Sequence, residues 1–222
     1  MKKLFSLICL FVTCLTIYAQ ENLIEDGKFE DTSFTVYDIY RKFPGPGKWY
    51  PYLTSDKQAV MSVIQDNDKG KAVSIQTLTG TSYAYSFIGQ RVEKNVSEGI
   101  YTLKFWAKAT KDIRTSVGVY LKVKTPKSQT LYFPISGFDP QTTPSRSGAL
   151  KTLILSNEWK EYTVEFDLSQ VVNSVPSPKV SKTEVIVKKS EVDHRKSFDV
   201  AIACMTKNSG MLFTDVSLVK KN

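Results

Sequence analysis

The feature that most constrains this chain is the alternation of apolar and polar side chains in one segment after another. In residues 101–109, for example, Leu103 and Phe105 alternate with Lys104 and Trp106. The same period of two recurs in residues 72–78, 117–123, 162–168 and 198–204. Successive side chains of a β-strand point to opposite faces, whereas a helix repeats every 3.6 residues. Each segment is therefore predicted to be a strand with one face toward a core.

Turn-forming residues separate these segments. Gly, Pro, Asn and Asp gather in residues 66–70, 97–99, 125–126 and 208–210, and no helical pattern intervenes. Strands that follow one another in this way pack as antiparallel sheets. We predict an all-β fold, a two-sheet antiparallel jelly-roll sandwich, with helix limited to a turn or two. No repeat or linker divides the chain, so residues 20–222 are predicted to form a single domain.

Three stretches interrupt the alternation. Residues 43–52 contain three prolines, which remove ladder donors, so this stretch cannot be a central strand. Residues 134–148 and 169–182 also contain prolines, and they are predicted to be long surface loops.

The first 19 residues resemble a secretory leader. Lys2 and Lys3 precede an apolar run over residues 4–17, and Ala19 offers a small residue at the cut. The run is shorter than the ~20 residues that span a bilayer. We predict a signal peptide over residues 1–19; the alternative is a lipid anchor on Cys14. Either places the protein outside the cytoplasm, as a secreted, periplasmic or cell-surface protein.

Charge and cysteine content exclude some functions. The formal net charge of +8 falls to +6 when Lys2 and Lys3 leave with the leader. The remaining lysines are scattered along the chain, which argues against nucleic-acid binding, although a basic surface can attract acidic polysaccharides. Of three cysteines, Cys204 alone remains after cleavage, so no intramolecular disulfide forms. Its apolar neighbours predict a buried structural thiol.

Four blocks of sequence carry a family resemblance. The first is Asn-Leu-Ile-Glu-Asp-Gly-Lys-Phe-Glu at residues 22–30, and the last is Phe-Thr-Asp-Val-Ser-Leu-Val at residues 213–219. Between them lie Gln-Arg-Val at 90–92 with the hairpin strand at 98–109, and Asn-Glu-Trp-Lys-Glu-Tyr-Thr-Val-Glu-Phe at 157–166. Together they resemble the galactose-binding-like β-sandwiches of carbohydrate-binding modules of families four, nine and twenty-two. The leader, with its early lysines and its Ala19-Gln20 junction, resembles those of Bacteroides-type secreted proteins of unassigned function. The resemblance of the four blocks implies that the two end segments lie close together.

The resemblance also implies a glycan ligand, an oligo- or polysaccharide. Sugar rings stack on aromatic faces, so aromatic side chains that point away from the core are the candidates. These candidates lie in residues 43–52, which are rich in Pro and Gly, and at outward positions of the predicted strands. They are Trp49, Tyr50, Tyr52, Tyr83, Tyr85, Trp106 and Tyr120. Ala201 and Ala203 share a face where small side chains leave a depression. The alternatives are that Tyr83 and Tyr85 pack beneath loops, and that the aromatics of residues 49–52 cap an open edge. Trp159 is predicted to lie in the core.

Metal binding is a second implication of the resemblance. Asp26, Glu30 and Asp215 lie in the two end segments, where the family resemblance implies a structural Ca²⁺ held by carboxylate and carbonyl oxygens. The alternative is a solvated acidic cluster paired with lysines such as Lys28. The histidine and cysteine set that transition metals need is missing from the sequence.

Catalysis finds little support in the sequence. Glycoside hydrolysis needs two carboxylates across a cleft, and no such pair is recognisable. His194 is the only histidine and has no nucleophile motif near it. We therefore predict a non-catalytic, exported carbohydrate-binding module that uses aromatic stacking. The alternative is a structural or adhesin-like envelope subunit that docks another protein.

Overall fold

The computed structural model describes residues 20–36, 45, 47–52, 59–78, 87–93, 99–124, 130–133, 151–167 and 198–221. Within these ranges the chain forms β-strands and no helix. The strands are β1 (Thr35–Val36), β2 (Trp49–Tyr52), β3 (Ala59–Asp66), β4 (Gly70–Thr77), β5 (Phe87–Val92), β6 (Ile100–Ala109), β7 (Ser116–Lys124), β8 (Thr130–Phe133), β9 (Lys151–Ile154), β10 (Lys160–Asp167), β11 (Phe198–Cys204) and β12 (Gly210–Lys220).

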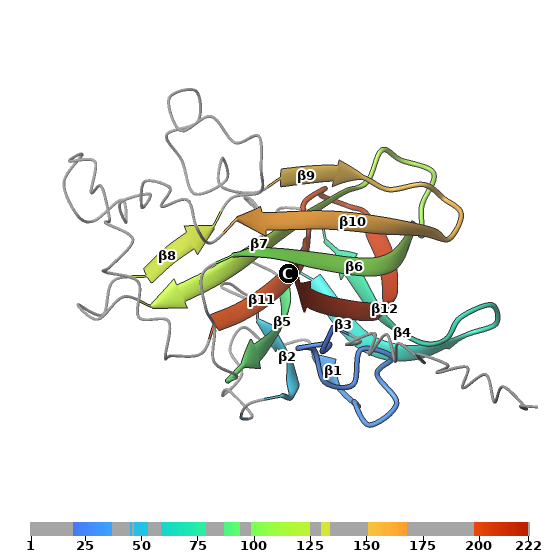
Figure 1. Ribbon diagram of the computed structural model, residues 1–222. Coiled ribbons are helices and arrows are strands. Elements are labelled where there is room, and N and C mark those ends of the chain that lie inside the picture. The colour runs from blue at the N-terminus through green and yellow to red at the C-terminus, as the bar shows by residue number, and fades with distance from the viewer. Residues whose placement is uncertain are drawn as a thin grey trace, which may run out of the picture.

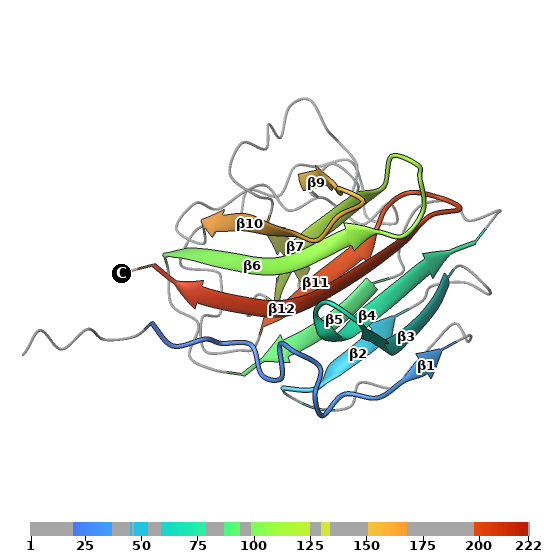
Figure 2. The ribbon, with the colours of Figure 1, turned by 90° about the vertical axis from the view of Figure 1, so that its right-hand side faces the viewer.

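The strands form two antiparallel sheets. Sheet A has the order β1-β3-β4-β12-β6-β10, and sheet B has the order β2-β5-β11-β7-β8, with β9 also paired to β7. Figure 1 labels the strands, and Figure 2 shows β12, β6 and β10 in one layer with β11 and β7 behind them. The predicted all-β, two-sheet sandwich is confirmed.

Alternation within each strand builds the core between the sheets. In β6, Leu103, Phe105 and Ala107 are fully buried, whereas Lys104 is exposed. In β11, Val200, Ile202 and Cys204 face the same core. Burial raises the pKa of the Cys204 thiol to about 11, which keeps it protonated and confirms the predicted structural thiol.

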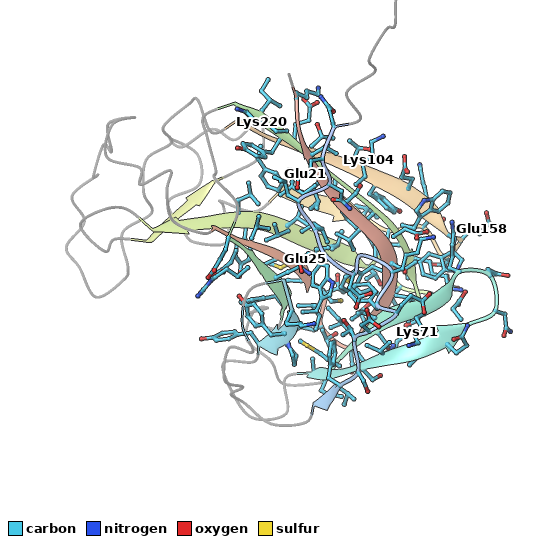
Figure 3. The ribbon with its side chains drawn as sticks, turned by 60° about the horizontal axis from the view of Figure 1, so that its bottom comes forward. Glu21, Glu25, Lys71, Lys104, Glu158 and Lys220 are labelled. Carbon is cyan, nitrogen blue, oxygen red and sulfur yellow. The ribbon has the colours of Figure 1, made fainter. Side chains whose placement is uncertain are left out.

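The chain ends meet as the resemblance implies. Asn22 bridges Val219, and the Leu23 amide donates to the Leu218 carbonyl at 2.8 Å. The Asn22 side chain also accepts from the Leu218 amide at 2.9 Å. Glu21 and Lys220, labelled in Figure 3, flank this bridge. Figure 2 shows the N-terminal segment running beside β12.

The segment after Asn22 is tied to both sheets. Gly27 lies so close to β12 that an added Cβ would stand 2.0 Å from the Val216 carbonyl oxygen, so only glycine fits. Gln90 of sheet B is fully buried; its side chain accepts from the Glu25 amide at 2.9 Å and donates to the Glu25 carbonyl at 2.7 Å. This opening motif therefore acts as a clamp across one end of the sandwich.

Residues 49–52 differ from the expected loop. They form β2, which pairs only with β5 at the edge of sheet B. An edge place suits Pro51, which cannot donate to a ladder, so the exclusion of a central strand is confirmed. The expectation that these aromatic side chains point away from the core is wrong for Trp49, which is buried in the main core, whereas Tyr50 is buried on the opposite face of β2.

Several predictions lie outside the described residues. These are the leader at 1–19 and the loops at 134–148 and 169–182. In the part of the chain that the structure describes, no helix is long and apolar enough to cross a bilayer.

Candidate functional site

A second apolar cluster lies on the outer face of sheet B, separate from the main core. Its buried members come from the four adjacent strands β2, β5, β11 and β7, and Tyr52 and Met205 pack against them. They are Tyr50, Phe87, Tyr120, Ala201 and Ala203. Strand alternation explains the separation: on β11, Ala201 and Ala203 point away from the core that Val200 and Ile202 enter.

Strand register aligns the cluster in cross-strand rows. Tyr50 stands opposite Gly89, Gly89 opposite Ala201, and Ala201 opposite Tyr120. Two tyrosines thus flank two of the smallest residues in one row. With neighbouring strands ~4.8 Å apart, the backbones of the two tyrosines are separated by roughly 14 Å. In the next row Tyr52 stands opposite Phe87.

Ring contacts hold this face together. The rings of Tyr52 and Phe87 are stacked, with centroids 4.8 Å apart, and Phe87 meets Tyr120 edge-on at 5.6 Å. Gly89 makes room for Tyr50: a Cβ there would stand 3.0 Å from the Cζ and hydroxyl of Tyr50. The glycine therefore lets the Tyr50 ring lie over the backbone of β5.

An ion pair adjoins the tyrosine row. Arg91 Nε donates to Asp199 Oδ1 at 2.8 Å, and the pair occupies opposite positions on β5 and β11. The bond to Asp199 raises the pKa of Arg91. Burial first, and then the negative charge of Asp199, raise the pKa of Tyr50 well above its usual value. Tyr50 is therefore a neutral phenol at physiological pH.

The structure brings some of the predicted ligand residues together. Tyr50, Tyr52 and Tyr120 share the outer face of sheet B with Ala201 and Ala203. Trp49 does not belong to this face, because it is 5% exposed and packs in the main core against Phe29, with ring centroids 5.0 Å apart. Tyr83 and Tyr85 lie outside the described residues.

Sequence reasoning missed Phe87, Gly89 and Arg91 on β5. The signal was present, because the three residues alternate with Ile88 and Gln90 and so share a face. What the sequence did not show was that β5 lies between β2 and β11.

Trp106 lies on the other sheet, on the outer face of sheet A. Lys69 Nζ stands 3.4 Å from the centroid of its ring, and Lys69 also pairs with Asp215 at 3.9 Å. The indole face is therefore covered by a cation. Trp106 is therefore not part of the aromatic cluster on the outer face of sheet B.

Trp159 corrects a prediction, since it is only partly buried and lies outside the core. Its indole Nε1 donates to Asp66 Oδ1 at 3.1 Å, and Lys108 Nζ stands 4.7 Å from its ring centroid. Lys108 also donates to Asp66 Oδ2 at 2.9 Å. Asp66, next to the β3–β4 turn, thus ties that turn to the outer face of sheet A.

The three predicted calcium ligands do not form one group. Among the described residues, no three His, Cys, Asp or Glu side chains lie close enough together to hold a metal ion. The Asp26 carboxylate instead accepts from the Glu30 amide at 2.6 Å and from the Thr32 hydroxyl at 2.6 Å. A lysine ammonium, that of Lys71 on β4 (labelled in Figure 3), donates to the Glu30 carbonyl. Calcium binding at this end stays a prediction.

Known structures share the sandwich. A protein from Bacteroides thetaiotaomicron VPI-5482, whose assignment as a sugar binding protein is itself a proposal, is 27% identical with a TM-score of 0.70, over 90% of this chain and 100% of that one. A CBM4 structure matches at 14% identity and a TM-score of 0.51, over 89% and 99% of the two chains. The enzymatically active domain of tailspike protein 4 from bacteriophage CBA120 also has a TM-score of 0.51, at 12% identity, over 90% of this chain and 21% of that one. The last two show the fold alone.

These likenesses confirm the predicted sandwich, a fold shared with a CBM4 structure, and the resemblance to a protein of Bacteroides type. A search of the curated proteins gave no match. A family model covers nearly the whole of the predicted domain, from residue 22 to residue 218. The chain belongs to the family described as a domain of unknown function, DUF4627.

Proposed function

We propose that this protein binds a carbohydrate, without transforming it, through the outer face of sheet B. The observation that carries the proposal is the row in which Tyr50 and Tyr120 flank Gly89 and Ala201. Aromatic faces stack on the C–H bonds of sugar rings. Gly89 and Ala201, between the two tyrosines, are buried, and the Tyr50 ring lies over Gly89.

Partial exposure singles out the residues that a ligand meets first. Tyr50, Phe87 and Tyr120 are 8–9% exposed, whereas Tyr52 is only partly buried and the Arg91 side chain is 27% exposed. Tyr52 and Arg91 are the first contacts under this proposal. The Bacteroides thetaiotaomicron structure supports the ligand class, since it is described as a proposed sugar binding protein and covers 90% of this chain.

Export completes the proposal. The predicted leader over residues 1–19, or its alternative, a lipid anchor at Cys14, would place the protein in the periplasm, at the cell surface or outside the cell. A carbohydrate-binding domain in that place meets oligo- and polysaccharides.

A glycan array and calorimetry on the purified protein test the function. Stacking on an aromatic side chain is worth ~1–3 kcal/mol, a scale taken from nucleic-acid bases. Tyr52→Ala is therefore expected to weaken binding about ten- to a hundredfold. Trp106→Ala is the matched control, because it removes an aromatic ring from sheet A. Equal binding by Tyr52→Ala, Tyr120→Ala and the wild type would exclude this face. Binding to no glycan, together with capture of one stoichiometric protein partner, would favour the docking subunit instead.

A further inference from the structure

Ile154 on β9 exposes a large apolar side chain to solvent, with an exposed fraction of 43%. Among the residues that the structure describes, the other large apolar side chains exposed by 36% or more are Ile64, Ile100 and Ile113. Single exposed apolar side chains are normal on a protein surface. Ile64 and Ile100 belong to sheet A and Ile113 to no strand, whereas Ile154 lies at the edge of sheet B, which carries the proposed carbohydrate site.

Strand register places Ile154 on the outer face of that sheet. Ile154 stands opposite Ser116 of β7, and Leu153 stands opposite Val117. Val117 is fully buried in the main core, and Leu153 packs against it. Because successive side chains of a strand alternate, Ile154 and Ser116 point the other way, to the face that Tyr120 of β7 also occupies. Figure 1 shows β9 beside β7.

Met205 joins Ile154 to the aromatic cluster. Its amide donates to the Ser116 carbonyl at 2.8 Å, so Met205 continues β11 on the other side of Ser116. The partly buried Met205 side chain packs against the cluster that contains Phe87 and Tyr120. With neighbouring strands ~4.8 Å apart, the backbones of Ile154 and Met205 are roughly 10 Å apart. The two apolar side chains therefore flank Ser116 at one corner of the proposed site.

Hydrogen bonds within the protein fix this corner. The Thr206 hydroxyl accepts from the Ser116 amide at 2.8 Å and lies 3.0 Å from the Ser116 hydroxyl. The Thr77 hydroxyl in turn donates to the Thr206 carbonyl at 2.6 Å. Ser116 thus already bonds to Thr206, and the large side chains that the corner presents to a ligand, those of Ile154 and Met205, are apolar.

We propose that Ile154 and Met205 recognise a methyl group on the bound sugar, either that of an O-acetyl ester or the C6 methyl of a 6-deoxyhexose. This inference rests on the carbohydrate-binding function proposed above. An aliphatic side chain forms no hydrogen bond, so a sugar hydroxyl placed against it loses its water without compensation. A methyl group at the same place buries apolar surface instead, which is worth about fourfold in affinity for one carbon group.

NMR titrations of the purified protein compare probes in pairs that differ in a methyl-bearing group. One arm pairs mono-O-acetylated xylohexaose and mannohexaose with the unmodified oligosaccharides. The other pairs L-fucose with L-galactose, and L-rhamnose with L-mannose. We expect the methyl-bearing member of at least one pair to bind about fourfold or more tightly than its partner. The arm that contains this pair identifies the methyl group as that of an ester or of a 6-deoxy sugar.

Two substitutions of Ile154 separate apolar contact from shape. Ile154→Val and Ile154→Thr both give β-branched side chains that suit a strand, and they differ by a hydroxyl in place of a methyl group. Both variants are expected to fold, because Ile154 is exposed. The valine variant should keep most of the preference, whereas the threonine variant should bind the two members of the pair equally. Ile64→Thr is the matched control on β3 of sheet A, and its preference should equal that of the wild type.

A preference that is lost in Ile154→Thr and persists in Ile154→Val and Ile64→Thr supports the inference. An unchanged preference in Ile154→Thr, or an equal loss in both Ile154 variants, overturns it. Equal binding of both members of every pair by the wild type also overturns it and leaves carbohydrate binding intact. Binding of none of these probes overturns the methyl selection, and binding to no glycan on the array overturns the carbohydrate-binding function itself.

Discussion

The ammonium of Lys69 lies 3.4 Å from the ring centroid of Trp106. The indole face that the sequence predicts as a ligand platform is thus already occupied by a cation. Lys69 reaches the indole from the β3–β4 turn, and it also forms an ion pair with Asp215. Trp106 therefore stabilises the outer face of sheet A. Its replacement is expected to lower the stability of the protein without weakening glycan binding.

Trp106→Ala should leave glycan binding within about twofold of the wild type, which corresponds to less than about 0.5 kcal/mol. It should lower the free energy of unfolding by about 1–3 kcal/mol, because a half-buried ring and its cation–π contact are lost. Urea denaturation and calorimetry on the same preparation measure both quantities. Loss of binding without loss of stability would return Trp106 to the ligand site.

Trp49→Ala should unfold the protein more easily, by ~3–5 kcal/mol, as a large core truncation does. Trp49 is 5% exposed, packs on Phe29, and its indole donates to the Asp26 carbonyl at 2.9 Å. Trp49→Phe is the paired variant, since it keeps a ring and removes the donor. Beyond the loss from its smaller buried ring, Trp49→Phe should lower the free energy of unfolding by about 1 kcal/mol, because the hydrogen bond to Asp26 is lost. Chemical denaturation of both variants tests this, and a stable Trp49→Ala protein would contradict the core placement.

Asp66 should make the stability of the protein sensitive to acid. Desolvation raises the pKa of this carboxyl, but hydrogen bonds from Lys108, from the Asp68 amide and from Trp159 outweigh it and hold the pKa below its usual value. As pH falls, Asp66 is therefore protonated at a higher pH in the unfolded chain than in the folded protein. The stabilisation is therefore present above pH ~4 and is lost as pH falls through the folded-state pKa. Thermal melts from pH 6 to pH 2.5 should show a shallower acid loss for Asp66→Asn than for the wild type. Glu161→Gln, which makes the same charge change at an exposed position on β10, should leave the acid loss unchanged.

Gly89→Ala should displace the Tyr50 ring, because the added Cβ would stand 3.0 Å from its Cζ and hydroxyl. We expect glycan binding to weaken about tenfold and stability to fall by ~1–3 kcal/mol, the usual cost of overpacking. A double-mutant cycle with Tyr50→Ala supplies the control. In the Tyr50→Ala background the obstacle is gone, so Gly89→Ala should cost little further stability. Additive losses in the cycle would show that Tyr50 does not lie over Gly89.

The period of two in the sequence determined the strands β4, β6, β7, β10 and β11 and the two faces of each. In β6 it separated Leu103 and Phe105 from Lys104, and in β11 it separated Ile202 from Ala201. These assignments depend only on local geometry, because successive side chains of any strand point to opposite faces. That the chain ends meet, as the Asn22–Val219 bridge shows, was implied only by the family resemblance of the two end segments.

Tertiary structure alone decided which outward faces coincide. Trp106 and Tyr120 both point away from the core on strands consecutive along the chain, yet β6 belongs to sheet A and β7 to sheet B. Sheet membership depends on long-range pairing, and a local period carries no information about it. The same reason explains Trp49 and Tyr50, since in a four-residue edge strand only the register against β5 settles which aromatic enters the core. It also explains the Arg91–Asp199 pair, whose residues lie 108 positions apart in the chain and meet only because β5 and β11 are neighbours.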